Sequence, residues 1–446
     1  MKTTSHPLFI ASLRDKLILR RSCRADAEAL ASFNAKMHSD DGPEEPDDQI
    51  AALTLDLMGG KHPTFGEHDF TVVEDPTSGE IVSCSALIPQ QWSYEGIPFG
   101  VGRLELIATD PRYRCKGLVR EQINILHEWG RDRGFLVQMI VGIPNFYRQF
   151  GYEMALPYAG GRGAYAPQIP SLDEGEAEAF TFRCATRDDL PLLEKGYRQM
   201  TGRSMVNVER TPEIWRYEME DIRERNVERM QFMMVENRDR KAVGFLAHRT
   251  AIDNGMLRLI LFEMFPGEGY QGLRGPVLRY LWKTGQEMAK AEGGTCSGVF
   301  ASLPLDHPFF SIAAEWMPRS RQPYALYIRV PDLSAFLRTL IPALEKRLAG
   351  SMMSGYSGDL VISRYRDASR LVFKDGRIEK IEGLALSENS EGDARFPGDT
   401  FLQVLFGFRS MDEVKYMWPD CGWNPETKAL VEIFFPKKPS YLWLVN

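Results

Sequence analysis

The chain lacks the patterns that mark several large classes of protein. Its six cysteines form no CxxC or CxH pair and its seven histidines no HExxH pair, so we expect reduced thiols and no metal site. No run of about 18 apolar residues occurs, and the apolar run near the N-terminus is too short for a signal peptide. Acidic residues outnumber basic ones by 61 to 54, a net charge of −7, which argues against a nucleic-acid partner. We therefore expect a cytoplasmic protein that binds no membrane.

What is present is the composition of an ordinary globular protein. Hydrophobic residues make up 43% and charged residues 26% of the 446 residues, which is enough apolar material for well-packed cores. At roughly 150 residues per domain, the length suggests about three domains.

Two stretches of the chain follow the same plan of helix, hairpin, strand, glycine-bearing joint, helix and buried strand. "RADAEALASFNAKM" begins at Arg24 and "RDDLPLLEKGYRQM" at Arg187; the hairpins that follow begin at Phe70 and Phe232. The separations are 46 and 45 positions. Chance alternation of helices and strands is the simpler explanation, but the shared order favours two copies of one α/β domain, over 1–175 and 176–322.

The remainder, 323–446, has a different plan. It begins with an amphipathic helix at "PDLSAFLRTLIPALEKRL", continues with a hairpin that turns at Asp375-Gly376, and then has two short apolar helices. "KALVEIFFP", which starts at Lys428, predicts a strand. This segment shows no catalytic pattern, and we expect a separate α+β domain.

The joint "DPRYRCKGLVREQINIL", from Asp110 to Leu126, carries the clearest chemical signal. It links a predicted strand to a predicted helix, and a helix start leaves about four backbone N–H groups unpaired, which attract phosphate. Gly117 lets a ligand approach the backbone closely, and Arg114, Lys116 and Arg120 supply countercharge. The joint therefore predicts an anion site, with a solvated basic loop as the alternative.

The same residues resemble a known family. "LIATDPRYRCKGLVR" followed by "GIPNFYRQFGYE" is similar to the coenzyme A site of the GNAT acyltransferases, whose loop reads Gln/Arg-x-x-Gly-x-Gly/Ala. Arg114, Gly117 and Val119 take those positions. Val119 replaces the usual small residue, and Cys115 stands where the family often has glycine; both departures narrow the loop.

The whole plan resembles the enhanced-intracellular-survival branch of that family. The resemblance implies tandem GNAT domains, the second without a cofactor, followed by a sterol-carrier-like α+β domain, and a hexameric homo-oligomer. In the second copy, Pro276 stands near the helix start and removes an N–H donor from the anion site. We therefore expect acetyl-CoA, as the acyl donor, to bind only the first copy.

By this resemblance the cofactor-binding residues are Ile107, Ala108, Thr109, Arg114, Cys115, Lys116, Gly117, Leu118, Val119, Arg120, Gly142 and Ile143. Tyr147 matches the family's general acid, and a neutral phenol can protonate a thiolate. The carboxylate of Asn446, the last residue of the sequence, would be the base. The alternative is that the apolar tail "SYLWLVN" simply packs as a final strand.

These residues predict an acetyl-CoA-dependent N-acetyltransferase. The acceptor would be the primary amine of a small cationic molecule or of a lysine side chain. The acidic run "PEEPDD" at 43–48 could attract such an amine, although a solvated loop is the simpler interpretation. Two alternatives stay open: a non-catalytic carrier that binds a ligand in its C-terminal domain, and transfer of a longer acyl chain.

Overall fold

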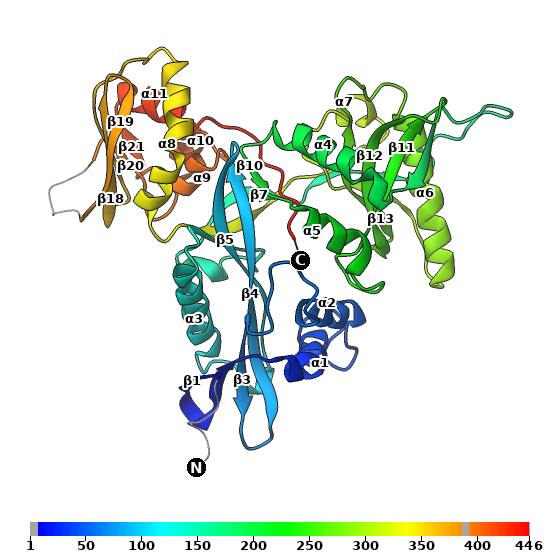
Figure 1. Cartoon of the computed structure of the whole chain (residues 1–446), viewed down its shortest axis with the longest axis horizontal. Helices are drawn as coiled ribbons and strands as arrows, with labels where there is room; N and C mark the ends of the chain where they lie inside the picture. The colour runs from blue at the N-terminus through cyan, green and yellow to red at the C-terminus, as the bar shows by residue number, and fades with distance from the viewer. Residues whose placement is uncertain (1–7, 386–391, 446) are drawn as a thin grey trace.

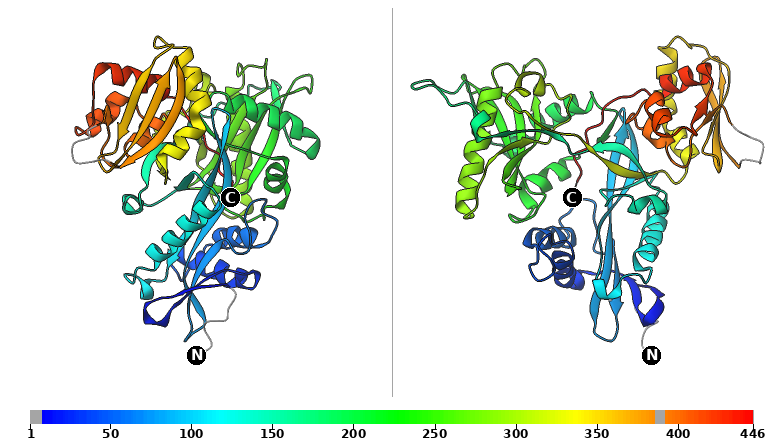
Figure 2. Two further views of the ribbon diagram at one scale, coloured as in Figure 1. Left: turned by 60° about the vertical axis from the view of Figure 1, so that its left-hand side comes forward. Right: turned by 180° about the vertical axis from the view of Figure 1, so that it is seen from behind.

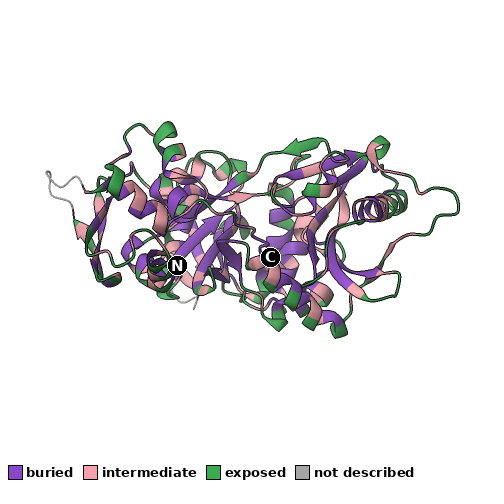
Figure 3. Ribbon diagram, turned by 90° about the horizontal axis from the view of Figure 1, so that it is seen from above, coloured by how far each residue is buried: buried purple, intermediate pink, exposed green. Residues whose placement is uncertain are grey.

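Three β-sheets with helices against them organise the residues that the computed structural model describes, which are 8–385 and 392–445. The first sheet stands between the other two, and the last described residues lie close to the centre of the molecule (Figure 1). Seen from above, buried residues gather along the strands, and exposed residues lie on loops and outer helix faces (Figure 3). No described helix combines the length and the apolar character needed to cross a membrane.

The first sheet has the strand order β1-β2-β3-β4-β5-β6-β16-β7, and β10 pairs with β4 beside this path. Its strands are β1 (Phe9–Ser12), β2 (Ile18–Arg21), β3 (Phe70–Asp75), β4 (Glu80–Tyr94), β5 (Ile97–Thr109), β6 (Val137–Ile140), β16 (Tyr324–Arg329), β7 (Glu153–Tyr158) and β10 (Val206–Val208).

Alternating side chains of β4 supply both faces of this sheet. Ala86 and Ile88 belong to a core shared with α1 (Ala27–Met37) and α2 (Asp48–Met58). Leu87 belongs to the opposite core with Leu126, on α3 (Leu118–Asp132). The helix that the sequence predicts after Gly117 is therefore present, and Figure 1 shows it on the face opposite α1 and α2.

The second sheet has the order β15-β8-β14-β13-β12-β11-β9. Its strands are β15 (Arg319–Arg321), β8 (Gly161–Tyr165), β14 (Gly298–Ala301), β13 (Met256–Met264), β12 (Ala242–Asp253), β11 (Met230–Asn237) and β9 (Phe180–Cys184). The helices of this segment are α4 (Leu190–Thr201), α5 (Pro212–Arg216), α6 (Arg274–Ala291) and α7 (Phe310–Ala313). The strand–joint–helix order of the first segment recurs here as β13 followed by α6.

Three strands pair with a sheet outside their own segment: β8, β16 and β10, which lies in the second segment and pairs with β4 of the first sheet. β8 precedes the position predicted as the boundary, residue 175, yet it pairs antiparallel with β14 of the second sheet. β16 follows residue 322 and inserts between β6 and β7 of the first sheet. At the first crossing Gly161 has φ +128, and a Cβ there would stand 1.9 Å from the Ala301 carbonyl oxygen. Only glycine allows so close an approach.

The third sheet has the order β19-β18-β17-β20-β21 and belongs to the C-terminal segment. Its strands are β17 (Gly358–Ser363), β18 (Asp367–Lys374), β19 (Arg377–Ala385), β20 (Ala394–Arg395) and β21 (Gly422–Trp423). Its helices are α8 (Leu333–Ala349), α9 (Phe401–Leu405), α10 (Met411–Met417) and α11 (Pro425–Phe434). The fold is thus mixed α/β throughout.

The strand predicted from Lys428 onward is wrong, because Lys428 to Phe434 lie in α11. The Asn424 side chain accepts a hydrogen bond from the Thr427 amide at 2.8 Å, and Pro425 takes the first helical position. Such a cap and proline favour a helix start. Leu430, Val431 and Phe434 are then buried on one face. The cap and the helical burial pattern together outweigh the β-preference of the apolar run.

After α11 the chain returns to the middle of the molecule, and we call residues 439–445 the tail. The Pro439 carbonyl accepts a hydrogen bond from the Met205 amide at 2.8 Å. The Val445 carbonyl accepts one from Gln90 Nε2, on β4, at 2.6 Å. Figure 2, from behind, shows the tail running from the C-terminal segment to a place between the first two sheets. The tail therefore links all three parts of the chain.

Candidate active site

The strand β5 separates from its neighbour β6 partway along its length. The parallel ladder joins Val101 to Val137 and ends at Arg103 with Met139, whereas β5 continues to Thr109. Leu106 has φ +49, and the pairing with β4 shifts register opposite it. This is a β-bulge, a device that redirects a strand next to many active sites. Among the described residues, β5 has no ladder partner on its β6 side beyond Arg103.

The predicted residues Ile107, Ala108 and Thr109 lie in this separated part of β5. The Ala108 carbonyl accepts a hydrogen bond from Ser83 Oγ at 2.7 Å, so it is engaged with β4. Thr109 borders a cavity of about 240 Å³ at the start of α3. The strand end therefore leads directly to the predicted anion site.

The joint forms a loop of unpaired backbone donors. Cys115 has φ +63 and Gly117 has φ +81, both left-handed, and α3 begins at Leu118. Within the described part of the chain, the amides from Gly117 to Arg120 donate to no protein acceptor, and Glu121 is the first that bonds back, to the Gly117 carbonyl. Successive free N–H groups at a helix start form an anion-binding concavity.

The cavity gathers most of the predicted loop residues. Arg114, Cys115 and the run Gly117 to Arg120 line it, together with Phe146 and Phe150. Arg120 donates to Gln149 Oε1 at 2.6 Å and stacks on the Phe150 ring at 4.9 Å. Arg114 bonds only the Thr109 carbonyl and has no carboxylate partner among the described residues. Two guanidinium groups are thus available beside the free amides.

Lys116 differs from its neighbours in the loop. Its ammonium group forms an ion pair with Asp15 at 2.6 Å and lies 5.2 Å from the centre of the Tyr113 ring. It does not line the cavity. The countercharge at the anion site therefore comes from Arg114 and Arg120.

Tyr147 lies on a short 3₁₀ turn, Phe146–Phe150, that follows β6. Its ring is 6% exposed and contacts Phe146, Tyr152 and Tyr327, with ring centres 5.0 to 6.2 Å apart. Burial, with a smaller contribution from the Glu105 carboxylate, raises the pKa of the Tyr147 hydroxyl above its usual value. The phenol is therefore protonated at neutral pH and able to donate a proton.

The two predicted residues at the end of β6 play different parts. Gly142 lies under the Tyr147 ring, so that a Cβ at position 142 would stand 2.2 Å from a ring carbon. Ile143 is 64% exposed, an unusual exposure for a large aliphatic residue. Gly142 thus fixes where the tyrosine lies, and Ile143 presents an apolar surface beside it.

The tail reaches β4 and β5 where β5 leaves β6. Arg103 Nη1 donates to the Val445 carbonyl at 3.1 Å, and its Nη2 forms an ion pair with Glu105 at 2.7 Å. Gln90, which also donates to Val445, accepts a hydrogen bond from the Trp92 indole at 2.9 Å. Val445 is 2% exposed. Asn446, the predicted base, lies outside the described residues.

Sequence reasoning missed Gln90, Arg103 and Glu105. The available signal was their polarity within otherwise apolar strands, in "LIPQQW" and "GRLELI". Buried polar residues in a strand usually have partners. Here the Val445 carbonyl of the tail is the partner of Gln90 and Arg103, and Arg103 is the partner of Glu105. That partner lies more than 300 positions away in the sequence, so no local pattern reveals it.

His38, directly after α1, was also missed. Its Nε2 is buried and has no hydrogen-bond partner in the described structure. Burial lowers the pKa of its imidazole, while the carboxylates of Glu105 and Asp47 act in the opposite direction. His38 therefore has a buried imidazole nitrogen without a hydrogen-bond partner among the described residues, and the charges of Glu105 and Asp47 act on it.

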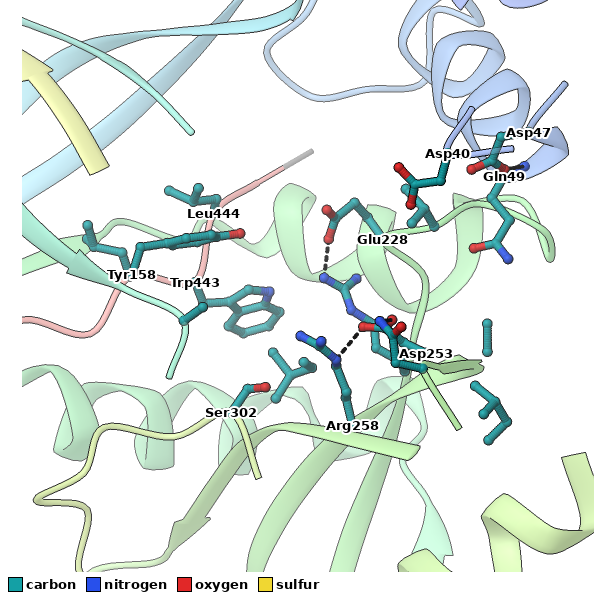
Figure 4. A pocket seen from close by; sticks show the side chains of 18 of the residues that line it. Asp40, Asp47, Gln49, Tyr158, Glu228, Asp253, Arg258, Ser302, Trp443 and Leu444 are labelled. Carbon is teal, nitrogen blue, oxygen red and sulfur yellow. Dashed lines mark hydrogen bonds and ion pairs between the residues drawn. The ribbon is translucent and has the colours of Figure 1, made fainter. Parts of the chain in front are cut away.

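A second cavity, of about 480 Å³, lies between the first and second sheets and is bounded by the tail (Figure 4). Four carboxylates and two arginines line it: Asp40, Asp47, Glu228, Asp253, Arg249 and Arg258. Arg258 pairs with Asp253 at 2.5 Å, and Arg249 pairs with Glu228. The two remaining carboxylates, Asp40 and Asp47, have no ion-pair partner among the described residues. The cavity therefore carries net negative charge and suits a cation.

The described residues contain no group of three or more His, Cys, Asp or Glu side chains placed to hold a metal ion. The candidate site is thus built from backbone amides, arginines, a buried tyrosine and carboxylates. Such groups can bind a phosphorylated donor, hold a cationic acceptor and move protons between them.

Residues 32–155 match the protein family described as "Acetyltransferase (GNAT) domain". The matched residues include the separated strand β5, the loop before α3 and Tyr147, which are the parts of the site described above. The chain thus carries a GNAT acetyltransferase domain and is an acyltransferase. Comparison with curated proteins finds no match.

Solved structures show the same fold over most of the chain. One is a probable N-acyltransferase of Enterococcus faecalis, with TM-score 0.64 and 12% identity over 96% of this chain and 100% of that one. Eis1 from Mycobacterium abscessus has a TM-score of 0.59 and 13% identity, over 96% of this chain and 99% of that one. N-myristoyltransferase from Saccharomyces cerevisiae, with bound myristoyl-CoA, has a TM-score of 0.51 and 12% identity, over 74% of this chain and 85% of that one. Together they are consistent with tandem GNAT-like folds.

Proposed function

We propose that this protein transfers an acetyl group from acetyl-CoA to a primary amine, on a small cationic molecule or a lysine side chain. The observation that carries the proposal is the run of free amides from Gly117 to Arg120, flanked by Arg114, at the end of the separated strand β5. In this position the diphosphate of acetyl-CoA would meet backbone donors and two guanidinium groups. The pantetheine arm would then follow the gap between β5 and β6.

The reaction joins the amine nitrogen to the thioester carbonyl carbon and breaks the carbon–sulfur bond. The ammonium proton must leave before attack, since a free alkylamine has a pKa of about 10.4. Free N–H groups along β5 would stabilise the oxyanion. Tyr147 gives its proton to the departing thiolate, and its raised pKa keeps that proton in place until then.

For the base we propose the carboxylate of Asn446. The support is the position of Val445, buried beside Arg103 and Glu105 at the point where β5 separates. His38 is the other group that could take the proton, since its Nε2 is free and neutral. Adding one glycine after Asn446 would move the carboxylate and should abolish turnover while acetyl-CoA binding stays; His38→Asn should then retain most of the rate. The reverse result would assign the base to His38.

For the acceptor site we propose the cavity of about 480 Å³. Asp47 belongs to the acidic run 43–48 whose role the sequence left open, and Asp40 lies shortly before that run. Figure 4 shows both on the wall opposite Trp443. Neither carboxylate has an ion-pair partner among the described residues, although Asp47 also caps α2 by accepting from the Gln49 amide at 2.7 Å. Carboxylates without a cationic partner attract a cationic amine. An acceptor with several amines would use them for binding while one neutral amine reacts.

By the same resemblance we propose that 1–175 and 176–322 are the tandem GNAT domains. β8 of the first pairs in the second sheet, and β16, which follows residue 322, pairs in the first sheet. We propose that 323–446 is sterol-carrier-like, and that the protein is a cytoplasmic homo-oligomer, a hexamer. The carrier alternative has less support. Aromatic pairs such as Phe373 with Phe434, stacked at 5.3 Å, occupy the core of the C-terminal segment.

The test is thiol release from acetyl-CoA over a panel of amines, with binding measured by calorimetry. Tyr147→Phe should lower the rate by about 10² to 10⁴ and leave binding intact. Tyr152→Phe is the matched control, because it also removes a hydroxyl from this aromatic cluster. The Tyr152 hydroxyl lies 2.9 Å from His127 Nε2. An unchanged rate in Tyr147→Phe would exclude it as the acid. Thermal stabilisation by acetyl-CoA without thiol release would favour a carrier, and activity with longer acyl-CoA would extend the donor range.

A further inference from the structure

Trp443 of the tail sits in a cage formed by the second domain. The guanidinium carbon of Arg210 lies 3.1 Å from the centre of the indole ring, and Arg210 Nη2 donates to the Trp443 carbonyl at 3.3 Å. Rings of Trp215, Phe232 and Tyr197 surround the indole, with centres 5.2, 5.6 and 5.8 Å away. The cage therefore holds both the side chain and the backbone of Trp443.

Arg210 is itself held in one orientation. Its two terminal nitrogens donate to the two carboxylate oxygens of Glu218 at 2.7 and 2.9 Å. The side chains are 0% and 3% exposed. A paired fork of this kind fixes the plane of the guanidinium group, which here lies against the indole ring. A buried ion pair contributes little to stability by itself. We therefore attribute to the Arg210–Glu218 pair the role of fixing the orientation of the guanidinium group.

The residues before Trp443 are also tied to the second domain, whereas the residue after Leu444 is tied to the first. The Tyr441 hydroxyl donates to the Ile260 carbonyl, on β13. Ser440 Oγ accepts at 3.1 Å from the amide of Val206, on β10, a strand of the second segment that pairs with β4. The next anchor along the tail is Val445, whose carbonyl accepts from Gln90 and Arg103. Trp443 is thus attached to the second domain two residues before Val445, which is attached to β4 and β5.

We propose that the Arg210–Glu218 pair positions the tail for catalysis: the second domain clamps Trp443 and thereby sets where the residues after it lie in the first domain's active site. The second domain contributes to the reaction through this clamp. Arg210 and Glu218 are positioning residues and touch neither donor nor acceptor. This inference rests on the proposed function, because it assigns the tail a part in acetyl transfer.

The donor site lies elsewhere, around Gly117, so the clamp and donor binding can be measured separately. The test variant is the double substitution Arg210→Met with Glu218→Leu, which leaves no unpaired buried charge. It should fold with a melting temperature near that of the wild type. Its kcat should fall by at least about tenfold, and up to about 10²-fold, as for other small displacements of reacting groups. Its dissociation constant for acetyl-CoA should stay within about twofold, because no donor contact changes.

The matched control is Arg279→Met with Glu178→Leu, which removes a second-domain ion pair with distances of 2.6 and 2.7 Å that makes no contact with the tail. Its kcat should equal that of the wild type. Arg210→Lys, which keeps the cation but loses the fork, should give an intermediate kcat. A folded Arg210→Met, Glu218→Leu protein with wild-type kcat would overturn the proposal.

Hydrogen–deuterium exchange of the C-terminal peptide separates this inference from the proposed function. Faster exchange at residues 443–445 in the Arg210→Met, Glu218→Leu protein is expected even if the wild type acetylates none of the amines tested. Faster exchange in the variant together with an inactive wild type would support the clamp and reject the proposed activity. Unchanged exchange would reject the clamp, whatever the activity.

Discussion

The ring of Tyr147 occupies the space that a side chain on Gly142 would need, with ring carbons 2.2 and 2.3 Å from the position of its Cβ. Gly142→Ala must therefore displace the tyrosine. We expect kcat to fall by about 10²-fold, since small shifts of a catalytic group have effects of that size. Thiol release at saturating acetyl-CoA measures it. Gly269→Ala is the control, because a Cβ at Gly269 meets nothing within 4 Å; an equal loss in both variants would refute the relationship.

Gly117 is needed for its backbone conformation, since a Cβ there meets open space while φ is +81. Left-handed backbone costs a non-glycine residue roughly 1–2 kcal/mol. If Gly117→Ala leaves this conformation, the amides of Leu118 and Val119 turn away from the anion site. We expect weaker acetyl-CoA binding, by about tenfold for each 1.4 kcal/mol, in calorimetry. Gly117→Asn should bind more tightly than Gly117→Ala, because asparagine tolerates this conformation better.

The three cations of the loop should differ in their effect on donor binding. Arg114→Gln and Arg120→Gln each remove a charge at the cavity, and we expect the KM for acetyl-CoA to rise and its dependence on salt to weaken. Lys116→Gln should have a smaller effect, because Asp15 already neutralises Lys116 at 2.6 Å. KM measured at low and high ionic strength distinguishes them. A larger effect at Lys116 would show that its side chain turns to the donor.

His307 should make stability fall in mild acid. Its Nδ1 accepts a hydrogen bond from the Phe309 amide, and its Nε2 lies 2.9 Å from the Phe262 carbonyl, which needs a donor. Only the neutral ring satisfies both. Burial lowers the pKa of His307 from 6.5 to about 4. The folded state therefore binds the proton less tightly than the unfolded state. The contribution of His307 to the free energy of unfolding is complete above pH 6.5 and is lost as the pH falls toward 4.

The expected loss is at most about 1.4 kcal/mol per pH unit from this group. Urea unfolding at pH 7 and pH 5 measures it. His307→Asn removes the titrating ring while its carbonyl can still accept from Phe309, so the variant should be less stable at pH 7 but lose less between the two pH values. An equal loss in variant and wild type would assign the acid sensitivity to other groups.

Local patterns predicted the parts of the site that are local in the chain. The joint before Leu118 reads as strand, glycine and helix because the apolar spacing and Gly117 are adjacent in sequence, and the structure has this order. Arg114 and Arg120 flank the free amides there, but Lys116 was indistinguishable from them, since its partner Asp15 is about a hundred positions away. Spacing gives no information about which cation is already neutralised.

Long-range pairings were beyond sequence reasoning for the same reason. The position of β16 between β6 and β7 depends on contacts between residues such as Ile328 and Met139, and apolar strands of similar composition are interchangeable in a single sequence. His38 gave no signal because its value depends on burial and on a free nitrogen. The wrong prediction of a strand in place of α11 had a local cause instead. The cap formed by Asn424 and Pro425 was visible in the sequence, but the apolar run after it was given more weight.

The exchange of β8 and β16 has a consequence for how the molecule can be divided. A fragment ending at residue 175 would carry β8 with no β14 to receive it, and would leave the edges of β6 and β7 bare. The complementary fragment would lack β8, so the edge of β14 would be bare, and its β16 would have no β6 or β7 to pair with. Exposed strand edges of this kind promote aggregation. We therefore expect the parts of the chain that carry the first two sheets to unfold in one transition and to resist proteolysis together, because each sheet is completed by a strand from outside its own segment.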